Sequence, residues 1–290
     1  MKVVPYAFYQ HPNIEKLLVD GSSCILYKET FSVDLNNERY LSSHAITLIL
    51  EGSLLIEHDI HHTTIKKNEL VFLPKGMYMV TDIIPEKKPF QALVFFFDAD
   101  LIDGFLKNFE QRIPDTNSSL LKIPYAVPLR LYVESLLKLY RNAENHQFTH
   151  TKLLEFLHLI AISPQGSAFL SKLQTLKQRT RIDIIRFMSD YFHKPLDIED
   201  YAYLTGRSIS TFRRDFKSKF HMPPKKWLIE KRLNMAATLL KTKNESIGTI
   251  AFAVGYESTS HFIKAFRKKF GTSPKKYLMD HRKKMEIQSF

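Results

Sequence analysis

The residues of this sequence best suited to chemistry are basic side chains set at helical spacing beside a stripe of phenylalanines. Phe212, Phe216 and Phe220 recur every four residues, which predicts one buried helix face, and the same spacing returns at positions 262, 266 and 270. The basic residues beside the two stripes are Arg213, Arg214 and Lys217 in the first segment and Lys264, Arg267 and Lys268 in the second. A helix that is buried on one face and basic elsewhere fits the major groove of DNA.

The two segments belong to an internal repeat. Residues 202–206 (AYLTG) recur as residues 251–255 (AFAVG), and after each glycine the offset between the copies rises from 49 to 50 residues. In each copy an apolar helix is followed by a glycine, where the chain must turn, and then by a serine that can cap the next helix, Ser208 or Ser258. This order predicts two helix-turn-helix units.

The charge distribution points to the same part of the chain. The formal net charge is +12, but residues 1–171 carry −3 and residues 172–290 carry +15. Such an asymmetry indicates a polyanionic partner for the second part alone. A merely solvated basic face would account for the charge equally well, so the repeat carries the argument.

Residues 180–284 resemble the tandem helix-turn-helix domain of AraC/XylS-family transcriptional regulators. The resemblance is most specific over residues 246–274, from SIGTIAFAVGYES to FRKKFGTSP. It implies two recognition helices, joined by a long helix over residues 224–240, that enter successive major grooves about 34 Å apart. It also implies double-stranded DNA as a partner, RNA polymerase as a second partner and an activating role.

The resemblance assigns contacts position by position. The implied base-contacting residues are Ser210, Arg213, Arg214, Thr259, Ser260, His261 and Lys264. The implied phosphate-contacting residues are Ser208, Lys217, Ser258, Arg267 and Lys268. Arg213 and Arg214 are the leading specificity residues, because a guanidinium reaches O6 and N7 of guanine together; one of the two could instead lie over the phenylalanine side chains. Trp227 matches Tyr277 of the second copy, which predicts packing and not base stacking.

The N-terminal half predicts an antiparallel β-structure. Short apolar runs between residues 20 and 98 are separated by glycines, prolines and asparagine, as in a small barrel or sandwich. Residues 50–54 and 69–76 resemble the central hairpin and the Pro-Lys-Gly turn of the cupin-like sensor domain of the same family. Ile46 stands where a metal-binding cupin has its second histidine, two residues after His44, so we expect no cupin metal site and no cupin enzyme.

Other residues with catalytic potential lack the partners that catalysis needs. His58, His61 and His62 lie in a hairpin tip with nothing that makes them converge, so no metal site is predicted there. Cys24 is the only cysteine, which excludes a disulfide framework within the chain, and no base accompanies it, which favours a small buried residue over a reactive thiol. No phosphate loop, nucleophile elbow or HExxH motif is present. We therefore expect no enzyme activity and no cofactor.

The remaining sequence predicts helices and a linker. The apolar positions of residues 129–140 predict a helix that either completes the sensor core or pairs with its copy in a homodimer, and a second helix covers residues 151–162. The predicted fold class is α+β, with a cupin-like antiparallel β-barrel and helical dimerisation segment followed by an all-α tandem helix-turn-helix domain. We expect a sensor and dimerisation domain over residues 1–163, a linker over 164–179 and the DNA-binding domain over 180–290.

Two kinds of regulatory signal to the N-terminal domain remain as alternatives. The barrel could hold a small effector, or a protein partner could control it, because residues 153–166 (LLEFLHLIAISPQG) resemble the subgroup that activates type III secretion operons. A cupin enzyme with a fused helical domain is a rival hypothesis, and nonspecific RNA or chromatin binding is another. The chain lacks an apolar run long enough to span a bilayer and a signal-peptide pattern, so we expect a cytoplasmic protein with no membrane partner.

Overall fold

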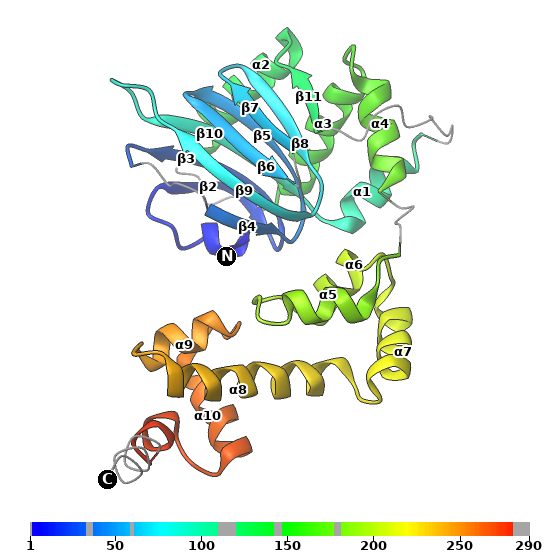
Figure 1. The fold of residues 1–290 in the computed structure, drawn as a ribbon. Helices are drawn as coiled ribbons and strands as arrows, with labels where there is room; N and C mark the ends of the chain where they lie inside the picture. Colours follow the sequence, from blue (N-terminus) through cyan, green and yellow to red (C-terminus); the bar gives the residue numbers. More distant parts are fainter. Residues whose placement is uncertain are drawn as a thin grey trace. The chain divides into compact units, whose positions relative to one another are not determined.

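The computed structural model of the protein describes residues 2–32, 37–58, 61–109, 120–141, 147–176 and 181–280. The chain divides into two compact units, residues 1–178 and residues 179–290. The first contains β-sheets with helices and the second is helical (Figure 1). The expected α+β class is therefore confirmed.

Two β-sheets face each other in the N-terminal unit. One has the strand order β1 (Lys2–Val4), β4 (Asn37–Leu41), β9 (Gly76–Ile83), β6 (Ser53–His58) and β7 (His61–Lys66). The other has the order β11 (Leu121–Pro124), β8 (Glu69–Leu73), β5 (His44–Glu51), β10 (Phe90–Phe97), β3 (Ser23–Thr30) and β2 (Ile14–Asp20). The pairings are antiparallel except for that of β1 with β4, which is parallel. The predicted barrel is thus a sandwich of two separate sheets, and a short 3-10 helix (Tyr6–Phe8) lies between β1 and β2.

Strand β10 explains how one sheet joins two cores. Its side chains alternate between the two faces of the sheet, and both faces are buried. Phe90 and Phe96 lie in the core between the sheets, whereas Phe95 and Phe97 lie in a second core between the sheet and a layer of helices. The Phe95 ring stacks on Phe156 with the ring centres 3.9 Å apart. The run Phe95–Phe97 is therefore core.

The helices that cover this sheet are α1 (Ala99–Leu106), α2 (Val127–Tyr140), α3 (Thr149–Ala161) and α4 (Gly166–Thr175) (Figure 1). The apolar face predicted for residues 129–140 is buried in this core, so of the two roles considered for it α2 takes the first, completing the core. That two chains pair stays a prediction.

The expected linker, residues 164–179, needs correction. Ten of its residues form α4, whose Phe169, Leu170 and Leu173 are buried in the N-terminal core. The run Ser163-Pro164-Gln165-Gly166 suggested a linker, but Gly166 already begins α4 and the apolar positions after it continue the core. Residues 177–180 lie outside the described ranges.

No single helix in the described ranges is long and apolar enough to cross a membrane, although α3 and α4 pass that test as a bent pair. Both helices place their apolar side chains in the N-terminal core.

The C-terminal unit contains α5 (Ile184–Tyr191), α6 (Ile198–Leu204), α7 (Ile209–Phe220), α8 (Pro224–Thr242), α9 (Ile247–Ala253) and α10 (Thr259–Phe270). The pairs α6–α7 and α9–α10 are the two predicted helix-turn-helix units, and α8 is the predicted long helix between them (Figure 1).

Candidate nucleic-acid interface

The helices α7 and α10 each begin at the predicted serine cap. The Ser208 Oγ accepts a hydrogen bond from the Thr211 backbone N–H at 3.3 Å, and the Ser258 Oγ accepts one from the His261 backbone N–H at 3.4 Å. Both serines were predicted as phosphate contacts. Their position at a helix N-terminus is compatible with that role, because backbone N–H groups there attract anions.

The glycine of each turn has the left-handed conformation that its position requires. Gly206 has φ +70° and Gly255 has φ +88°. A Cβ atom on Gly255 would lie 2.7 Å from the His193 carbonyl oxygen and 3.1 Å from the Arg232 guanidinium. The turn of the second helix-turn-helix unit, between α9 and α10, therefore packs directly against the loop between α5 and α6.

The phenylalanine stripes fix the rotation of both helices. Phe212 and Phe216 are fully buried, as are Phe262 and Phe266 in the second copy. The Trp227 ring centre lies 5.6 Å from Phe216 and 4.9 Å from Phe220. Tyr277 makes the matching contacts with Phe266 and Phe270 at 5.4 and 5.5 Å. The prediction that Trp227 packs is confirmed.

With the stripes buried, most predicted contact residues are exposed. The exposed ones are Ser208, Ser210, Arg213, Arg214, Lys217, Ser260, His261, Lys264, Arg267 and Lys268, whereas Ser258 and Thr259 are half-buried. Helical spacing places Ser210, Arg214 and Lys217 on the side of α7 opposite its stripe, and Arg213 closer to the edge. The equivalent of Arg213 in α10 is Ile263, which lines a shallow depression with Ser260, Lys264, Arg267 and Lys268.

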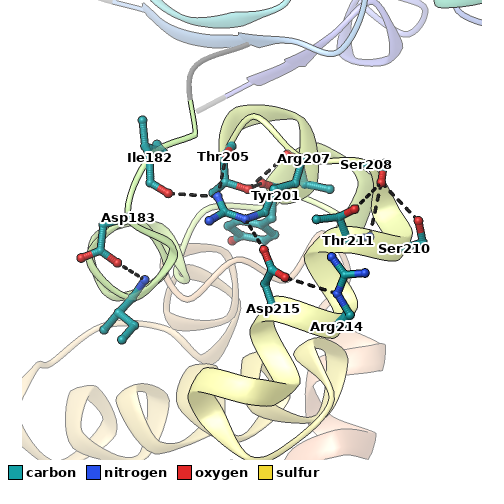
Figure 2. Close-up of polar contacts among 12 residues, drawn as sticks. Ile182, Asp183, Tyr201, Thr205, Arg207, Ser208, Ser210, Thr211, Arg214 and Asp215 are labelled. Carbon is teal, nitrogen blue, oxygen red and sulfur yellow. Dashed lines mark hydrogen bonds and ion pairs between the residues drawn. The ribbon is translucent and has the colours of Figure 1, made fainter. Parts of the chain in front are cut away.

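Two residues that were not predicted from the sequence, Arg207 and Asp215, form an ion pair at α7. Arg207 donates to the Ile182 and Thr205 carbonyl oxygens, at 2.9 and 2.6 Å, and its Nε donates to Asp215 Oδ2 at 3.1 Å. Figure 2 shows Asp215 between Arg207 and Arg214. The hydrogen bond from Arg207 is the main reason that the pKa of the Asp215 carboxyl is below its ordinary value. The available signal was that Asp215 is the single acidic residue of α7.

A third residue that was not predicted from the sequence, Arg232, connects the two helix-turn-helix units. Arg232 of α8 donates from Nε to the Phe192 carbonyl oxygen at 2.7 Å and from its terminal nitrogen to the Lys194 carbonyl oxygen. Its guanidinium also lies where a side chain on Gly255 would stand. Arg232, which is half-buried, therefore contacts both the loop before α6 and the turn before α10.

Comparisons with known proteins agree with this geometry. Residues 201–280 match the family model of a helix-turn-helix domain, and residues 44–172 match the model of the ExsA N-terminal regulatory domain. The HTH-type transcriptional regulator ExsA of Pseudomonas aeruginosa is 28% identical over 247 residues, covering 83% of this chain and 86% of the relative. The virulence regulon transcriptional activator VirF of Yersinia enterocolitica is 25% identical, covering 76% of this chain and 83% of the relative.

Together these matches support an AraC/XylS-family transcriptional regulator. The chain is a DNA-binding transcriptional regulator. Among solved structures, ToxT K231A from Vibrio cholerae matches 90% of this chain and 98% of its own, at 14% identity and a TM-score of 0.43. An AraC-type regulator from Chromobacterium violaceum matches 38% of this chain and 96% of its own, at 29% identity and a TM-score of 0.31.

The N-terminal unit has a charged centre between its two sheets. Lys28 is hydrogen-bonded to Asp82, Arg39 lies 3.4 Å from the same carboxylate, and all three side chains are buried. They line a cavity of about 30 Å³ whose other walls are mostly apolar. A cavity of that size holds about one or two water molecules.

The other residues considered for chemistry are placed as follows. Cys24 is fully buried, and burial raises the pKa of its thiol to about 12, which opposes reactivity. His44 accepts a hydrogen bond at Nδ1 from the Lys75 backbone N–H at 3.1 Å. The side chains of His58 and His61 lie outside the described residues; His62 is exposed and lies 3.6 Å from Glu57. Within the described ranges no three metal-ligating residues form a cluster.

Proposed function

We propose that α7 and α10 are two recognition helices that enter successive major grooves of one DNA duplex, about 34 Å apart. In this docking the base contacts are those predicted from the sequence: Ser210, Arg213, Arg214, Thr259, Ser260, His261 and Lys264. The phosphate contacts are likewise the predicted ones: Ser208, Lys217, Ser258, Arg267 and Lys268. The observation that carries the proposal is the equal rotation of the two helices. Each buries its stripe and turns the same basic side to solvent.

Within this proposal Arg214 is the leading base-reading residue. It lies opposite the buried stripe, and its side chain is 75% exposed. An arginine on that side of a recognition helix can give both terminal nitrogens to one guanine. Arg213 lies nearer the helix edge and has an isoleucine as its counterpart, so its share in reading bases is smaller.

The test is selection of bound duplexes from a random DNA pool by the full-length chain, followed by salt titration on the selected sequence. We expect a motif with two preferred blocks about ten base pairs apart, one for each recognition helix. Recovery of no motif, with salt-sensitive binding to every duplex, would instead support nonspecific binding by charge.

We further propose that the N-terminal domain regulates DNA binding, and that the protein-partner input is favoured over a small effector. The cavity between the sheets, at about 30 Å³, is far below the roughly 300 Å³ of ordinary ligand pockets. A small effector at Lys28, Arg39 and Asp82 would have to separate the sheets. Native mass spectrometry of the purified chain decides between the two, since a retained small molecule would contradict the protein-partner input.

Activation and assembly complete the proposal. The chain acts as an activator that contacts RNA polymerase, and it binds DNA as a homodimer, because pairing multiplies affinity through effective concentration without new contacts. The apolar face of α2 is buried in its own core, so the dimer uses another surface. Sedimentation equilibrium of the free chain and of its DNA complex measures the stoichiometry; one chain per complete site would contradict the homodimer.

A further inference from the structure

The carboxylate of Asp215 lies between two arginines of very different exposure. Its Oδ2 accepts a hydrogen bond from Arg207 Nε at 3.1 Å, and its Oδ1 lies 3.6 Å from Arg214 Nε. The Arg207 side chain is 11% exposed, whereas that of Arg214 is 75% exposed. One arginine is therefore part of the interior of the unit and the other faces solvent.

Arg207 holds the Asp215 carboxylate in place because the Arg207 guanidinium is itself held by backbone hydrogen bonds. One of its terminal nitrogens donates to two backbone carbonyl oxygens, those of Ile182 and Thr205, while Nε donates to Asp215 (Figure 2). A guanidinium held at several points has little rotational freedom left, and its planar geometry dictates where the carboxylate must lie.

Asp215 in turn restrains Arg214. A free arginine side chain samples many rotamers, and ordering it on DNA has an entropic cost. The carboxylate attracts the Nε side of Arg214, which leaves the terminal nitrogens directed away from it. Those two nitrogens are the donors that a bidentate contact with guanine O6 and N7 requires.

We propose that Asp215, held by Arg207, is a positioning residue that orients Arg214 for base reading in the first half-site. The inference rests on the proposed docking of α7 in the major groove. It adds a residue that carries the wrong charge for DNA and that contacts no base.

The second unit lacks this arrangement. The counterparts of Arg214 and Asp215 are Lys264 and Ala265, and the turn position of Arg207 is taken by Tyr256, which packs on Phe262 with the ring centres 5.4 Å apart. The effect of Asp215 is therefore confined to the half-site that α7 contacts, and the other half-site serves as an internal reference.

Asp215→Asn in the full-length chain tests the proposal, because it keeps the shape and removes the charge. The readout is competition binding on four duplexes that differ at one base pair, the one whose preference Arg214→Ala abolishes. We expect discrimination at that base pair to fall about twofold to fivefold, the range of a partly exposed ion pair. Affinity for random duplex should stay equal or increase, since a negative charge facing phosphates is removed.

Glu257→Gln is the matched control. It removes one carboxylate from the exposed turn before α10, so it should change affinity for random duplex similarly and leave discrimination at the chosen base pair unchanged. Circular dichroism and thermal unfolding establish that each variant is folded.

Two results would overturn the proposal: unchanged discrimination by Asp215→Asn, or an equal loss of affinity on all duplexes, which indicates a structural role. The test also separates this inference from the docking on which it rests. If Arg214→Ala relaxes no base pair, the docking of α7 fails; if it relaxes one that Asp215→Asn leaves intact, the positioning role alone fails.

Discussion

The two helix-turn-helix units share their buried parts and differ in what surrounds them. Both have a serine cap, a positive-φ glycine, two fully buried phenylalanines and a large aromatic residue on the following helix. Around this common interior the first unit has the Arg207–Asp215 ion pair, whereas the second has Tyr256 against Phe262. The shared buried residues are those that the fold of a helix-turn-helix unit requires, and the residues around them are those by which the two units can differ in function.

Several exposed positions differ between α7 and α10; at one of them the arginine is in α10, since Lys217 corresponds to Arg267. Arg213, Arg214 and Ser218 of α7 correspond to Ile263, Lys264 and Lys268 of α10. Arginine suits bidentate base reading, while lysine acts as a point charge toward phosphates. We therefore expect the first unit to contribute more to sequence preference and the second more to salt-dependent affinity.

The largest effect is expected from Gly255→Ala, which tests the packing between the units. The alanine would adopt φ +88° with its Cβ 2.7 Å from the His193 carbonyl oxygen, so we expect a loss of about 3 kcal/mol of stability. Gly271→Ala is the control, because it has φ +72° but open space, and it should cost about 1 kcal/mol. Urea unfolding followed by the fluorescence of Trp227, the single tryptophan, reports on this unit; equal losses would contradict the close packing.

Arg232→Met should have the next largest effect, because it removes the hydrogen bonds that join the units. Leaving the Phe192 and Lys194 carbonyl oxygens without these donors should cost about 2 kcal/mol in the same unfolding measurement. The variant should also tolerate a change of one base pair between half-sites better than the natural chain does. Arg186→Met, at an exposed position, is the control and should be near neutral. A spacing preference as strict as that of the natural chain would show that Arg232 does not set it.

The features that occur in both helix-turn-helix units could be predicted from the sequence, whereas contacts that occur in only one place could not. Stripe, glycine and cap follow periodic or local rules, so α6, α7, α9 and α10 could be predicted with their exposed faces. Arg207 and Arg232 act through carbonyl oxygens 25 and 40 residues away in the sequence, contacts that no local pattern encodes. The linker was predicted at the wrong position for a related reason. The apolar residues of α4 pack against α1 and α3, a tertiary contact that the local sequence does not reveal.

Arg214→Ala and Lys264→Ala compare base reading in the two units directly, since the residues are equivalent. Arg214→Ala should cost about 1–3 kcal/mol on the selected site and relax the preference at one base pair. Lys264→Ala should cost less and relax less, because a lysine cannot make the bidentate contact. Binding to the selected duplex and to single-base variants measures both. Equal losses from Arg214→Ala on selected and random DNA would contradict its base-reading role.

The smallest effect is expected at the phosphate-facing side, where Lys268 corresponds to Ser218. Lys268→Ala should weaken binding to all duplexes alike and lower the slope of log affinity against log salt by about one, the contribution of one neutralised phosphate. Ser218→Ala should leave the slope unchanged, because no cation is lost. Salt titrations on selected and random duplexes measure both slopes. A loss restricted to the selected duplex would mean that α10 reads bases at this position, and the division of roles between the two units would then disappear.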